Sequence, residues 1–393
     1  SLTFSRSVRM SQVDTDVVPQ ESDHKIDDQP EIHIIKPRVP SSLLTPSHIQ
    51  YSLRHFIGIP GAYTALDQNR LTVLFFNLGS LDILNEIDRI SEQRQKLVNW
   101  IYSLQITTAE GAPEDACGFR GSFTTAIDPK ITVEGEKVKD AANLAQTYSA
   151  LLCLYILGDD LSKVKRSAIL NTIKKAQTEL GCFNSQGVDS ECDMRYVYCA
   201  VSIAYMLGDD SCIDWKRLSE FIQKCVSYDG GIGQMPTDES HGGSTYCAIA
   251  ALSLSNRLWD ESVLTRKQLE RLTKWAIYKQ EKGFHGRANK IDDSCYAFWI
   301  GATLEMLNSF PLVGQDELRS FLYSVQFPPL GGFCKLQETG GHPDLLHTYF
   351  SLAALSILKE PSFQSMFTPL NVTRRVHESV GRRRIQLARL SSI

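Results

Sequence analysis

The chain has 393 residues, of which 42% are hydrophobic and 22% charged, so it is long enough to bury a large core. Its formal net charge of −4 argues against a general nucleic-acid-binding protein. No run approaches the roughly 20 apolar residues of a membrane span, and the acidic first thirty residues lack the apolar stretch of a signal peptide. With ten cysteines that show no close pairing, these features predict a cytoplasmic protein.

The two ends differ in composition from the middle of the chain. Residues 1–45 are polar, acidic and interrupted by prolines, which is typical of a disordered segment. Residues 373–393 are rich in arginine and are interpreted as a basic C-terminal tail, a solvated helix or frayed end rather than a partner-binding segment. We therefore expect one folded domain over residues 46–372.

Within that domain the sequence repeats with a period of about 50 residues. Residues 157–160 (Leu-Gly-Asp-Asp) return as residues 207–210. A glycine followed closely by an apolar residue recurs between the helical stretches. A tyrosine opens an apolar run in five places: Tyr148, Tyr198, Tyr246, Tyr296 and Tyr349.

Each repeat predicts two helices in the same order. An amphipathic helix comes first, as at residues 97–104, and the pattern returns near residues 218–222, 269–276 and 318–325. A glycine loop leads to a second helix that is apolar nearly all round, at residues 148–157, 246–254, 296–307 and 349–358. A helix that is apolar on every side is buried on every side. The pattern predicts an all-α fold of repeated helical hairpins, either an open solenoid or a closed α/α toroid (α-α barrel).

Polar residues gather just before the apolar helices, at equivalent places in successive repeats. Asp293, Cys295 and His347 offer the oxygen, sulfur and nitrogen ligands of a catalytic zinc site that keeps one position open. Donors suited to a diphosphate stand in the same phase, namely His241, Arg287, Lys290 and the hydroxyl of Tyr296. Together they suggest a thiolate that attacks a carbon bearing a diphosphate leaving group.

Each of these residues also has a structural explanation. Cys295 at a helix start is the position of a packed core cysteine, and Asp293 is suited to an N-cap. His347 could be a capping or core histidine, and Arg287 and Lys290 could belong to a solvated loop. Their common phase in the repeat favours the functional interpretation, because a structural role does not require it.

The polar segments resemble the β-subunits of protein prenyltransferases over about residues 70–372. The resemblance rests on several separated motifs in one order, at residues 193–199, 239–245, 293–299 and 342–347. Further segments are similar to the type I geranylgeranyltransferase of that family, at residues 70–76, 99–105, 117–122 and 285–290.

This resemblance implies an α/α toroid paired as a heterodimer with a prenyltransferase α-subunit. The implied reaction transfers a geranylgeranyl group from geranylgeranyl diphosphate to the cysteine of C-terminal CaaX motifs, through a zinc-bound thiolate. X is usually Leu or Phe, and Rho-type small GTPases are the expected substrates. One Zn²⁺ per β-subunit would be bound by Asp293, Cys295 and His347. Lys335 matches a magnesium-binding aspartate of the farnesyl enzyme, so Mg²⁺ is not expected to be required.

The resemblance also assigns roles to individual positions. Asp293, Cys295, His347, Lys335 and Tyr296 are the implied catalytic residues, and His241, Arg287, Lys290, Tyr296 and Lys335 would neutralise the departing diphosphate. Arg195, Thr72 and Phe76 match positions of the lipid cavity, and Thr72 stands where the farnesyl enzyme has a tryptophan that closes the cavity floor. The implied peptide pocket consists of Thr72, Asn143, Tyr196 and Leu346.

Two features depart from the family pattern. Asn143 stands where animal type I enzymes have a histidine, so the preference for the last CaaX residue is open. Lys335 and His347 are separated by two more residues than the family leads us to expect.

Three other interpretations fit the sequence less well. A farnesyltransferase β-subunit disagrees with Thr72 and Lys335. A non-catalytic helical-repeat scaffold that binds peptides would not need His, Cys, Asp, Arg and Lys in one phase. A terpene cyclase would need an Asp-x-Asp-Asp box, which the sequence lacks.

Overall fold

A computed structural model of the 393-residue chain describes residues 40–110, 112–113, 115–126, 132–133, 136–137, 141–187, 190–337 and 341–390. Nearly all of the segment expected to be disordered, residues 1–45, lies outside this part. The described residues are mainly helical, which confirms the all-α prediction. The limits of the folded domain that we expected at residues 46 and 372 remain a prediction.

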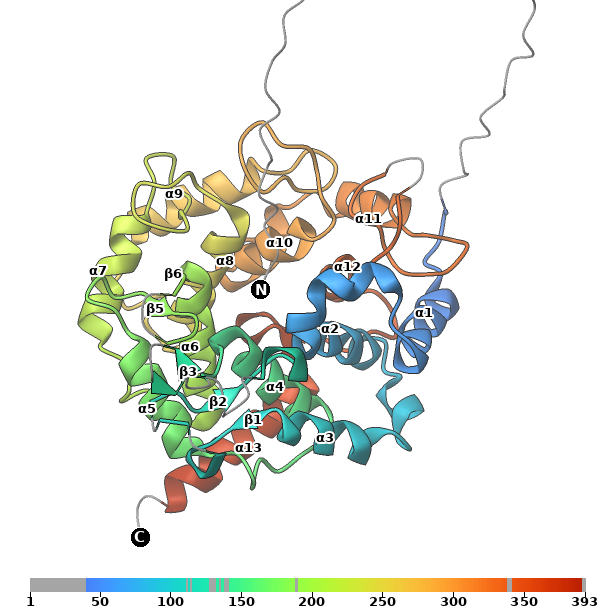
Figure 1. Ribbon diagram of the computed structural model, residues 1–393. Helices are drawn as coiled ribbons and strands as arrows, with labels where there is room; N and C mark the ends of the chain where they lie inside the picture. The colour runs from blue at the N-terminus through green and yellow to red at the C-terminus, as the bar shows by residue number, and fades with distance from the viewer. Residues whose placement is uncertain are drawn as a thin grey trace, which may run out of the picture. The chain divides into compact units, whose positions relative to one another are not determined.

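The described chain forms helical hairpins, each with an outer and an inner helix (Figure 1). The outer helices are α1 (Thr45–Ile57), α3 (Arg94–Ser103), α5 (Arg166–Ala176), α7 (Trp215–Cys225), α9 (Arg266–Ile277) and α11 (Gln315–Ser324). The inner helices are α2 (Arg70–Ile83), α4 (Leu144–Ile156), α6 (Met194–Leu207), α8 (Gly242–Leu254), α10 (Tyr296–Met306) and α12 (Leu345–Ile357).

Short elements connect the hairpins. Four two-stranded antiparallel ribbons pair β1 (Gln105–Ile106) with β2 (Gly118–Phe119), β3 (Thr132–Val133) with β4 (Glu136–Lys137), β5 (Phe183–Asn184) with β6 (Cys192–Asp193), and β7 (Met366–Phe367) with β8 (Val372–Thr373). Turns of 3-10 helix are η1 (Gly61–Asn69), η2 (Ile87–Ile90), η3 (Thr108–Glu110), η4 (Phe123–Thr125), η5 (Phe310–Leu312) and η6 (Thr368–Leu370).

The inner helices form a closed ring. Along the chain each inner helix packs against the next, and α2 packs against both α4 and α12. An open solenoid would leave α2 and α12 each with one uncovered apolar side, and the closed ring covers both. The outer helices bury only one face, as α7 does through Leu218, Phe221 and Ile222. The structure is therefore the closed α/α toroid, the alternative that sequence periodicity left open.

Hydrogen bonds tie the starts of the inner helices to one another around the ring. The first backbone N–H of α4, at Leu144, donates to the carbonyl of Ser185 in the following repeat, over 2.9 Å. The equivalent bonds run from Met194 to Gln234, Gly242 to Gly286, Ser294 to Lys335, and Leu345 to the hydroxyl of Tyr63. These bonds hold the N-terminal ends of five inner helices in one circle, which we call the rim.

The N-terminal ends of inner helices carry polar caps. The side chains of Asn143, Asp193, His241 and Asp344 accept hydrogen bonds from backbone N–H groups of the first turns of α4, α6, α8 and α12. Asp293 accepts in the same way from the backbone N–H of Cys295. Because each helix N-terminus carries partial positive charge, the rim favours negatively charged groups.

Five residues after each cap position stands an aromatic residue that faces the barrel axis. These residues and the corresponding Phe75 of α2 form what we call the aromatic belt: Phe75, Tyr148, Tyr198, Tyr246, Phe298 and Tyr349. Ring contacts run around the belt and close through Phe350, with centroids between 5.1 and 6.2 Å apart. The belt crosses the barrel below the rim.

The aromatic belt corrects one position in the tyrosine repeat that the sequence predicted. Phe298, not Tyr296, contacts the ring of Tyr246 and is the α10 member of the belt. Tyr296 lies two residues earlier, nearer the rim, where its hydroxyl contacts His241. The shift arises because residues 294 and 295 form a turn before α10 begins. The approximate 50-residue period is unaffected.

The C-terminal segment closes the barrel end opposite the rim. The hydroxyls of Tyr246 and Tyr349 donate to the carbonyls of Thr368 and Asn371, over 2.7 and 2.6 Å. That of Tyr148 donates to the carbonyl of Leu370, over 3.3 Å. The carbonyls of η6 and of the residue after it are thus held directly below the belt.

The segment expected as a basic tail forms α13 (Arg374–Leu390), which packs against α4 and α6. Its Val376 and Val380 are fully buried, and Arg375 makes an ion pair with the buried Asp82 of α2. This differs from a frayed or solvated end, because part of the helix covers the ring.

Candidate metal centre and active-site rim

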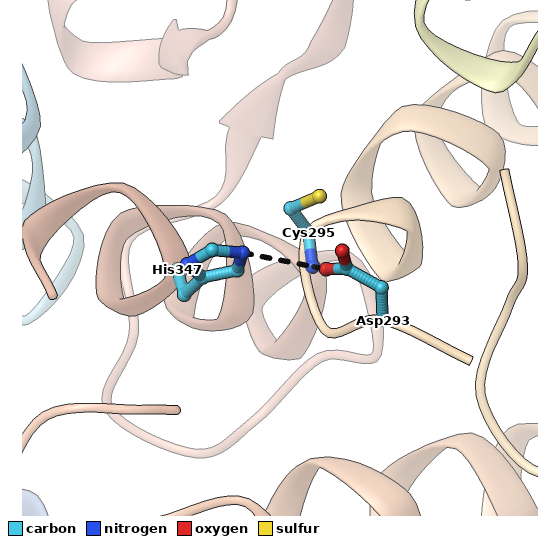
Figure 2. A group of neighbouring side chains, drawn as sticks. All are labelled: Asp293, Cys295 and His347. Atoms are coloured by element: carbon cyan, nitrogen blue, oxygen red, sulfur yellow. Dashed lines mark hydrogen bonds and ion pairs between the residues drawn. The ribbon is translucent and has the colours of Figure 1, made fainter. Parts of the chain in front are cut away.

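Three potential metal ligands meet on the rim, at the starts of α10 and α12. One ligand atom each from Asp293, Cys295 and His347 lies within 4.8 Å of the other two (Figure 2). Asp293 and Cys295 stand two residues apart in the turn before α10, and His347 lies in the first turn of α12. The structure therefore brings together the oxygen, sulfur and nitrogen donors that the sequence suggested, from segments about 50 residues apart.

Hydrogen bonds orient these side chains. The Oδ1 atom of Asp293 accepts from the backbone N–H of Cys295, over 3.0 Å. The Nδ1 atom of His347 lies 2.6 Å from the carboxylate of Asp344, which also caps α12. When Nδ1 donates to that carboxylate, Nε2 is left to face Asp293, 3.4 Å away. The arrangement resembles the carboxylate–histidine pairs that fix the tautomer of metal-binding histidines.

Asp344 is not among the site residues predicted from the sequence. The sequence signal for this residue is the spacing Asp-x-x-His at a helix start. At this spacing the side chain of the N-cap residue lies close to that of the third helical residue. The sequence could not distinguish this pairing from an ordinary cap, because both use the same spacing.

Burial and charge act in opposite directions at the cluster. Burial by itself lowers the pKa of His347, but hydrogen bonds with Asp293, Asp344 and Cys295 outweigh it, so the pKa lies well above its usual value. Burial raises the pKa of Asp293, but His347 and the Cys295 N–H outweigh it and the pKa is lowered. Burial raises the pKa of the Cys295 thiol to about 12. These directions favour an ionised Asp293 paired with a protonated His347, beside a neutral Cys295 thiol, and a bound cation would take the place of the His347 proton.

Lys335 lies beside the cluster. Its Nζ atom is 3.6 Å from Oδ2 of Asp293, and its side chain is 59% exposed. The backbone carbonyl of Lys335 accepts from the N–H of Ser294, as part of the rim. The structure therefore places a fixed positive charge next to the three potential ligands, with its ammonium reaching solvent.

His241 and Tyr296 form a second pair on the rim. The Nε2 atom of His241 lies 2.9 Å from the hydroxyl oxygen of Tyr296, and its Nδ1 accepts from the N–H of Gly243. Burial, with smaller effects of Arg287 and Arg195, lowers the pKa of His241 to about 4. The lowered pKa favours a neutral His241 that is hydrogen-bonded to Tyr296, and the expected part of His241 in binding a diphosphate stays a prediction.

The ring of Tyr296 lies directly over Gly286. A Cβ at this glycine would come within 2.1 Å of Cζ and 2.5 Å of the hydroxyl oxygen of Tyr296. The carbonyl of Gly286 also accepts from the N–H of Gly242. Gly286 is therefore a site residue that the sequence does not predict, because only its tertiary contact with Tyr296 reveals it.

Arg287 and Lys290 occupy an exposed loop that leads into Asp293. Arg287 makes a long ion pair with Glu239, over 3.8 Å, and both side chains are about half exposed. Such exposed pairs are weak. The guanidinium is thus available to a competing anion above the rim.

Arg195 is more firmly held than the other predicted cations. Its Nη2 atom lies 2.6 Å from Asp193 and 3.3 Å from Glu191. Glu191 also accepts from the hydroxyl of Tyr196, over 2.9 Å. These carboxylates orient Arg195 and offset its charge, which suits a side chain that lines an apolar site rather than one that binds a phosphate.

The remaining predicted residues lie at different depths. Thr72, in the first turn of α2, is 3.1 Å from the hydroxyl of Ser149, whereas Phe76 lies one turn deeper and packs on Tyr349. Asn143 uses its side chain to cap α4, and Leu346 is half-buried beside His347. Thr72 therefore lies at the rim end of its helix, and the aromatic belt crosses the barrel below it.

The fold and the rim together define a class, an α/α-toroid protein with a candidate metal centre at one end of its barrel. The family model described as "Prenyltransferase alpha-alpha toroid domain" matches residues 43–378. The chain belongs to this family, and within it to the protein prenyltransferase β-subunits.

Two relatives carry the more particular comparison. Over 332 residues the chain is 38% identical to "Geranylgeranyl transferase type-1 subunit beta" of Dictyostelium discoideum, which covers 82% of this chain and 93% of that protein. Over 335 residues it is 35% identical to the protein of the same name from Arabidopsis thaliana, covering 83% and 88%. The family expected from the sequence motifs is thereby confirmed.

A solved structure agrees in fold. "Candida albicans protein geranylgeranyltransferase-I complexed with GGPP" superposes with a TM-score of 0.77 and 25% identity, covering 87% of this chain and 99% of that chain. In the described part of the present chain, none of the helices has the length and apolar character that crossing a lipid bilayer requires.

Proposed function

We propose that this chain is the zinc-dependent catalytic β-subunit of a type I protein geranylgeranyltransferase. It would transfer a geranylgeranyl group from geranylgeranyl diphosphate to the cysteine of a C-terminal CaaX motif. The observation that carries the proposal is the convergence of Asp293, Cys295 and His347 within 4.8 Å on the rim. The similarity to type-1 geranylgeranyl transferase β-subunits over most of the chain supports the type.

The cluster suits zinc in its chemistry. One carboxylate, one thiol and one imidazole form a mixed donor set that leaves a fourth position for a substrate. His347 is oriented by Asp344, and the buried Cys295 thiol needs a nearby cation to ionise. When bound, zinc would hold the substrate cysteine as a thiolate at neutral pH.

The residues around the cluster would receive the diphosphate. Tyr296 accepts from Nε2 of neutral His241, so its own hydroxyl hydrogen is free to point at a phosphate oxygen. Lys335 would add a fixed positive charge beside the cluster, and Arg287 and Lys290 would add two more from the loop above it. Charges placed in advance stabilise a leaving group without reorganisation. Lys335 is why we expect no requirement for Mg²⁺.

The barrel interior would hold the organic parts of the substrates. The aromatic belt provides an apolar surface below the rim, where Phe76 packs on Tyr349, and Thr72 and Arg195 lie in the first turns of α2 and α6. We assign the last CaaX residue to Thr72, Asn143, Tyr196 and Leu346. Because Asn143 already caps α4, it has less freedom to read that residue than an uncommitted side chain has.

The proposal includes a partner and a location. A prenyltransferase α-subunit would complete the enzyme as a heterodimer, and Rho-type small GTPases are the expected protein substrates. A cytoplasmic location agrees with the ten cysteines, all of which lie in described segments and form no disulfide.

A lipid competition assay tests the function. The chain is co-expressed with a prenyltransferase α-subunit and given a peptide ending in Cys-aliphatic-aliphatic-Leu, zinc, no magnesium, and equal farnesyl and geranylgeranyl diphosphate. Predominant C20 transfer supports the proposal. Predominant C15 transfer, or activity that needs magnesium, would instead indicate a farnesyltransferase β-subunit. A heterodimer that binds no stoichiometric zinc and transfers neither lipid would favour a non-catalytic peptide-binding scaffold.

A further inference from the structure

The loop between Phe284 and Asp293 carries two of the proposed diphosphate-binding side chains. Arg287 and Lys290 lie on its exposed part, and its last residue is the metal-ligand candidate Asp293. The loop leaves the core at the fully buried Phe284, whose carbonyl accepts from the N–H of Asp293, over 3.0 Å. The outgoing arm of the loop, which starts at Phe284, and the returning arm, which ends at Asp293, therefore run side by side at the base. The contacts at this base decide where the side chains of Arg287 and Lys290 lie.

The side chain of Asp292 links the two arms of the loop at their base. Its Oδ2 atom accepts from the backbone N–H groups of Lys282 and Gly283, over 3.0 and 2.8 Å. Its side chain is only 11% exposed. A carboxylate with two backbone donors is a strong local restraint.

The second oxygen of Asp292 faces His285 on the opposite arm. Oδ1 of Asp292 and Nδ1 of His285 are 3.7 Å apart, and the His285 side chain is 13% exposed. Each of these two atoms is buried and has no other hydrogen-bond partner within the described part of the chain. Buried polar atoms normally find partners, because leaving them unsatisfied is costly. The gap exceeds an ordinary hydrogen bond by about 0.5 Å, so a small movement of the loop would close it.

Other restraints on the loop are fewer. The N–H of Gly242 holds the carbonyl of Gly286, and the N–H of His285 donates to the carbonyl of Lys279. The Arg287–Glu239 ion pair is long and half exposed, so it contributes little. The arm that carries Lys290 into Asp293 is therefore fastened chiefly through Asp292.

We propose that His285 and Asp292 form a latch that positions Arg287 and Lys290 for a diphosphate, without touching the substrate themselves. The inference rests on the proposed function for the identity of the ligand, and on the loop geometry for the latch. In this arrangement a bound diphosphate and the closed His285–Asp292 hydrogen bond stabilise the same position of the loop. Losing the latch weakens diphosphate binding and leaves the metal ligands in place.

The test compares loss of the latch with its conservative replacement in the heterodimer. His285→Leu and Asp292→Ala remove the pair, whereas His285→Asn keeps a side-chain donor near the position of Nδ1. Glu281→Gln, at an exposed neighbouring position, is the matched control. We measure KM for geranylgeranyl diphosphate, KM for the peptide, kcat and zinc content.

We expect KM for geranylgeranyl diphosphate to rise about tenfold in His285→Leu and Asp292→Ala, as for loss of one charge-assisted hydrogen bond. The peptide KM and zinc content should stay near wild type, and His285→Asn should restore most of the loss. An unchanged KM for the lipid in both removal variants would overturn the latch. So would a parallel loss of kcat and zinc in all three latch variants, since that indicates a merely structural role.

Two readouts without turnover separate the latch from the function. Hydrogen exchange at the Lys282 and Gly283 amides should be faster in Asp292→Ala, and inorganic diphosphate should bind about tenfold more weakly to it, by the same reasoning. If the wild-type heterodimer transferred no lipid, the proposed function would fail, and the latch would still be judged by these measurements. Wild-type exchange and wild-type diphosphate affinity in Asp292→Ala would refute it.

Discussion

The Nδ1 atom of His347 lies 2.6 Å from Oδ2 of Asp344, and this contact turns a helix cap into a support for the candidate metal centre. The same carboxylate accepts from the backbone N–H of His347. One aspartate therefore holds both the backbone and the ring of a potential ligand. A ligand held in this way loses less freedom when a metal binds.

Removing this support should weaken metal binding more than it harms the fold. Asp344→Ala is expected to lower the zinc affinity of the heterodimer by 10- to 100-fold, about the effect of losing an oriented partner of a metal-binding histidine. Competition with a chromogenic chelator measures it. The matched control is Asp214→Ala, which removes a comparable cap from α7, away from the site. Equal zinc affinity in the two variants would show that Asp344 acts only as a cap.

The contact between Gly286 and Tyr296 predicts a steric effect on catalysis. In Gly286→Ala the new methyl would overlap Cζ of Tyr296, 2.1 Å away, and displace the hydroxyl from His241. We expect kcat to fall by about tenfold or more, because overpacking of 1–3 kcal/mol is enough to move the ring. Steady-state kinetics measure it, with Gly58→Ala as a control that has no atom within 4 Å of its added Cβ. Wild-type kcat in Gly286→Ala would mean that the position of Tyr296 is unimportant.

The belt predicts a stability effect at the far end of the barrel. Tyr246→Phe keeps the buried ring but leaves the carbonyl of Thr368 without this donor. The expected loss is about 1–2 kcal/mol in the free energy of unfolding. Denaturant titration measures it, against Tyr278→Phe, whose ring is 71% exposed. If both variants were equally stable, the hydroxyls would not be what fastens η6 to the belt.

His48 predicts a pH dependence of stability. Burial lowers its pKa to about 4, while Nδ1 accepts from the N–H of Gly332. The unfolded chain, with a usual pKa near 6.5, binds the proton first. Stability from this residue is therefore constant above about pH 6.5 and falls by about 3 kcal/mol as the pH drops toward 4.

Thermal unfolding between pH 7.5 and 4.5 checks this expectation. His48→Asn keeps an acceptor for Gly332 and cannot be protonated there, so its curve against pH should be flatter than that of wild type. His342→Asn changes an exposed histidine and should retain the wild-type slope. Parallel curves for wild type and His48→Asn would contradict the burial argument.

Much of the fold was accessible from the sequence, since helices leave a periodic signature in the chain. The all-round apolar composition of α8 and α12 predicted burial on every side, and the 50-residue spacing predicted hairpins in phase. The candidate ligands were accessible for the same reason, because Asp293, Cys295 and His347 lie at or near the starts of inner helices. Family motifs added the roles of Lys335 and Tyr296, which spacing alone does not assign.

The tertiary structure decided what depends on contacts between repeats. The ring closes because α2 packs against α12, and no local sequence pattern predicts a contact between helices so far apart in the chain. The register of α10 required the turn at residues 294–295, which moved Tyr296 to the rim and Phe298 into the belt. The neutral state of His241 and the pairing of Asp344 with His347 depend on burial and on atoms a few ångströms apart. By itself the sequence determined which residues this protein has on its rim, whereas packing decided which of them carry charge and which hold the others in place.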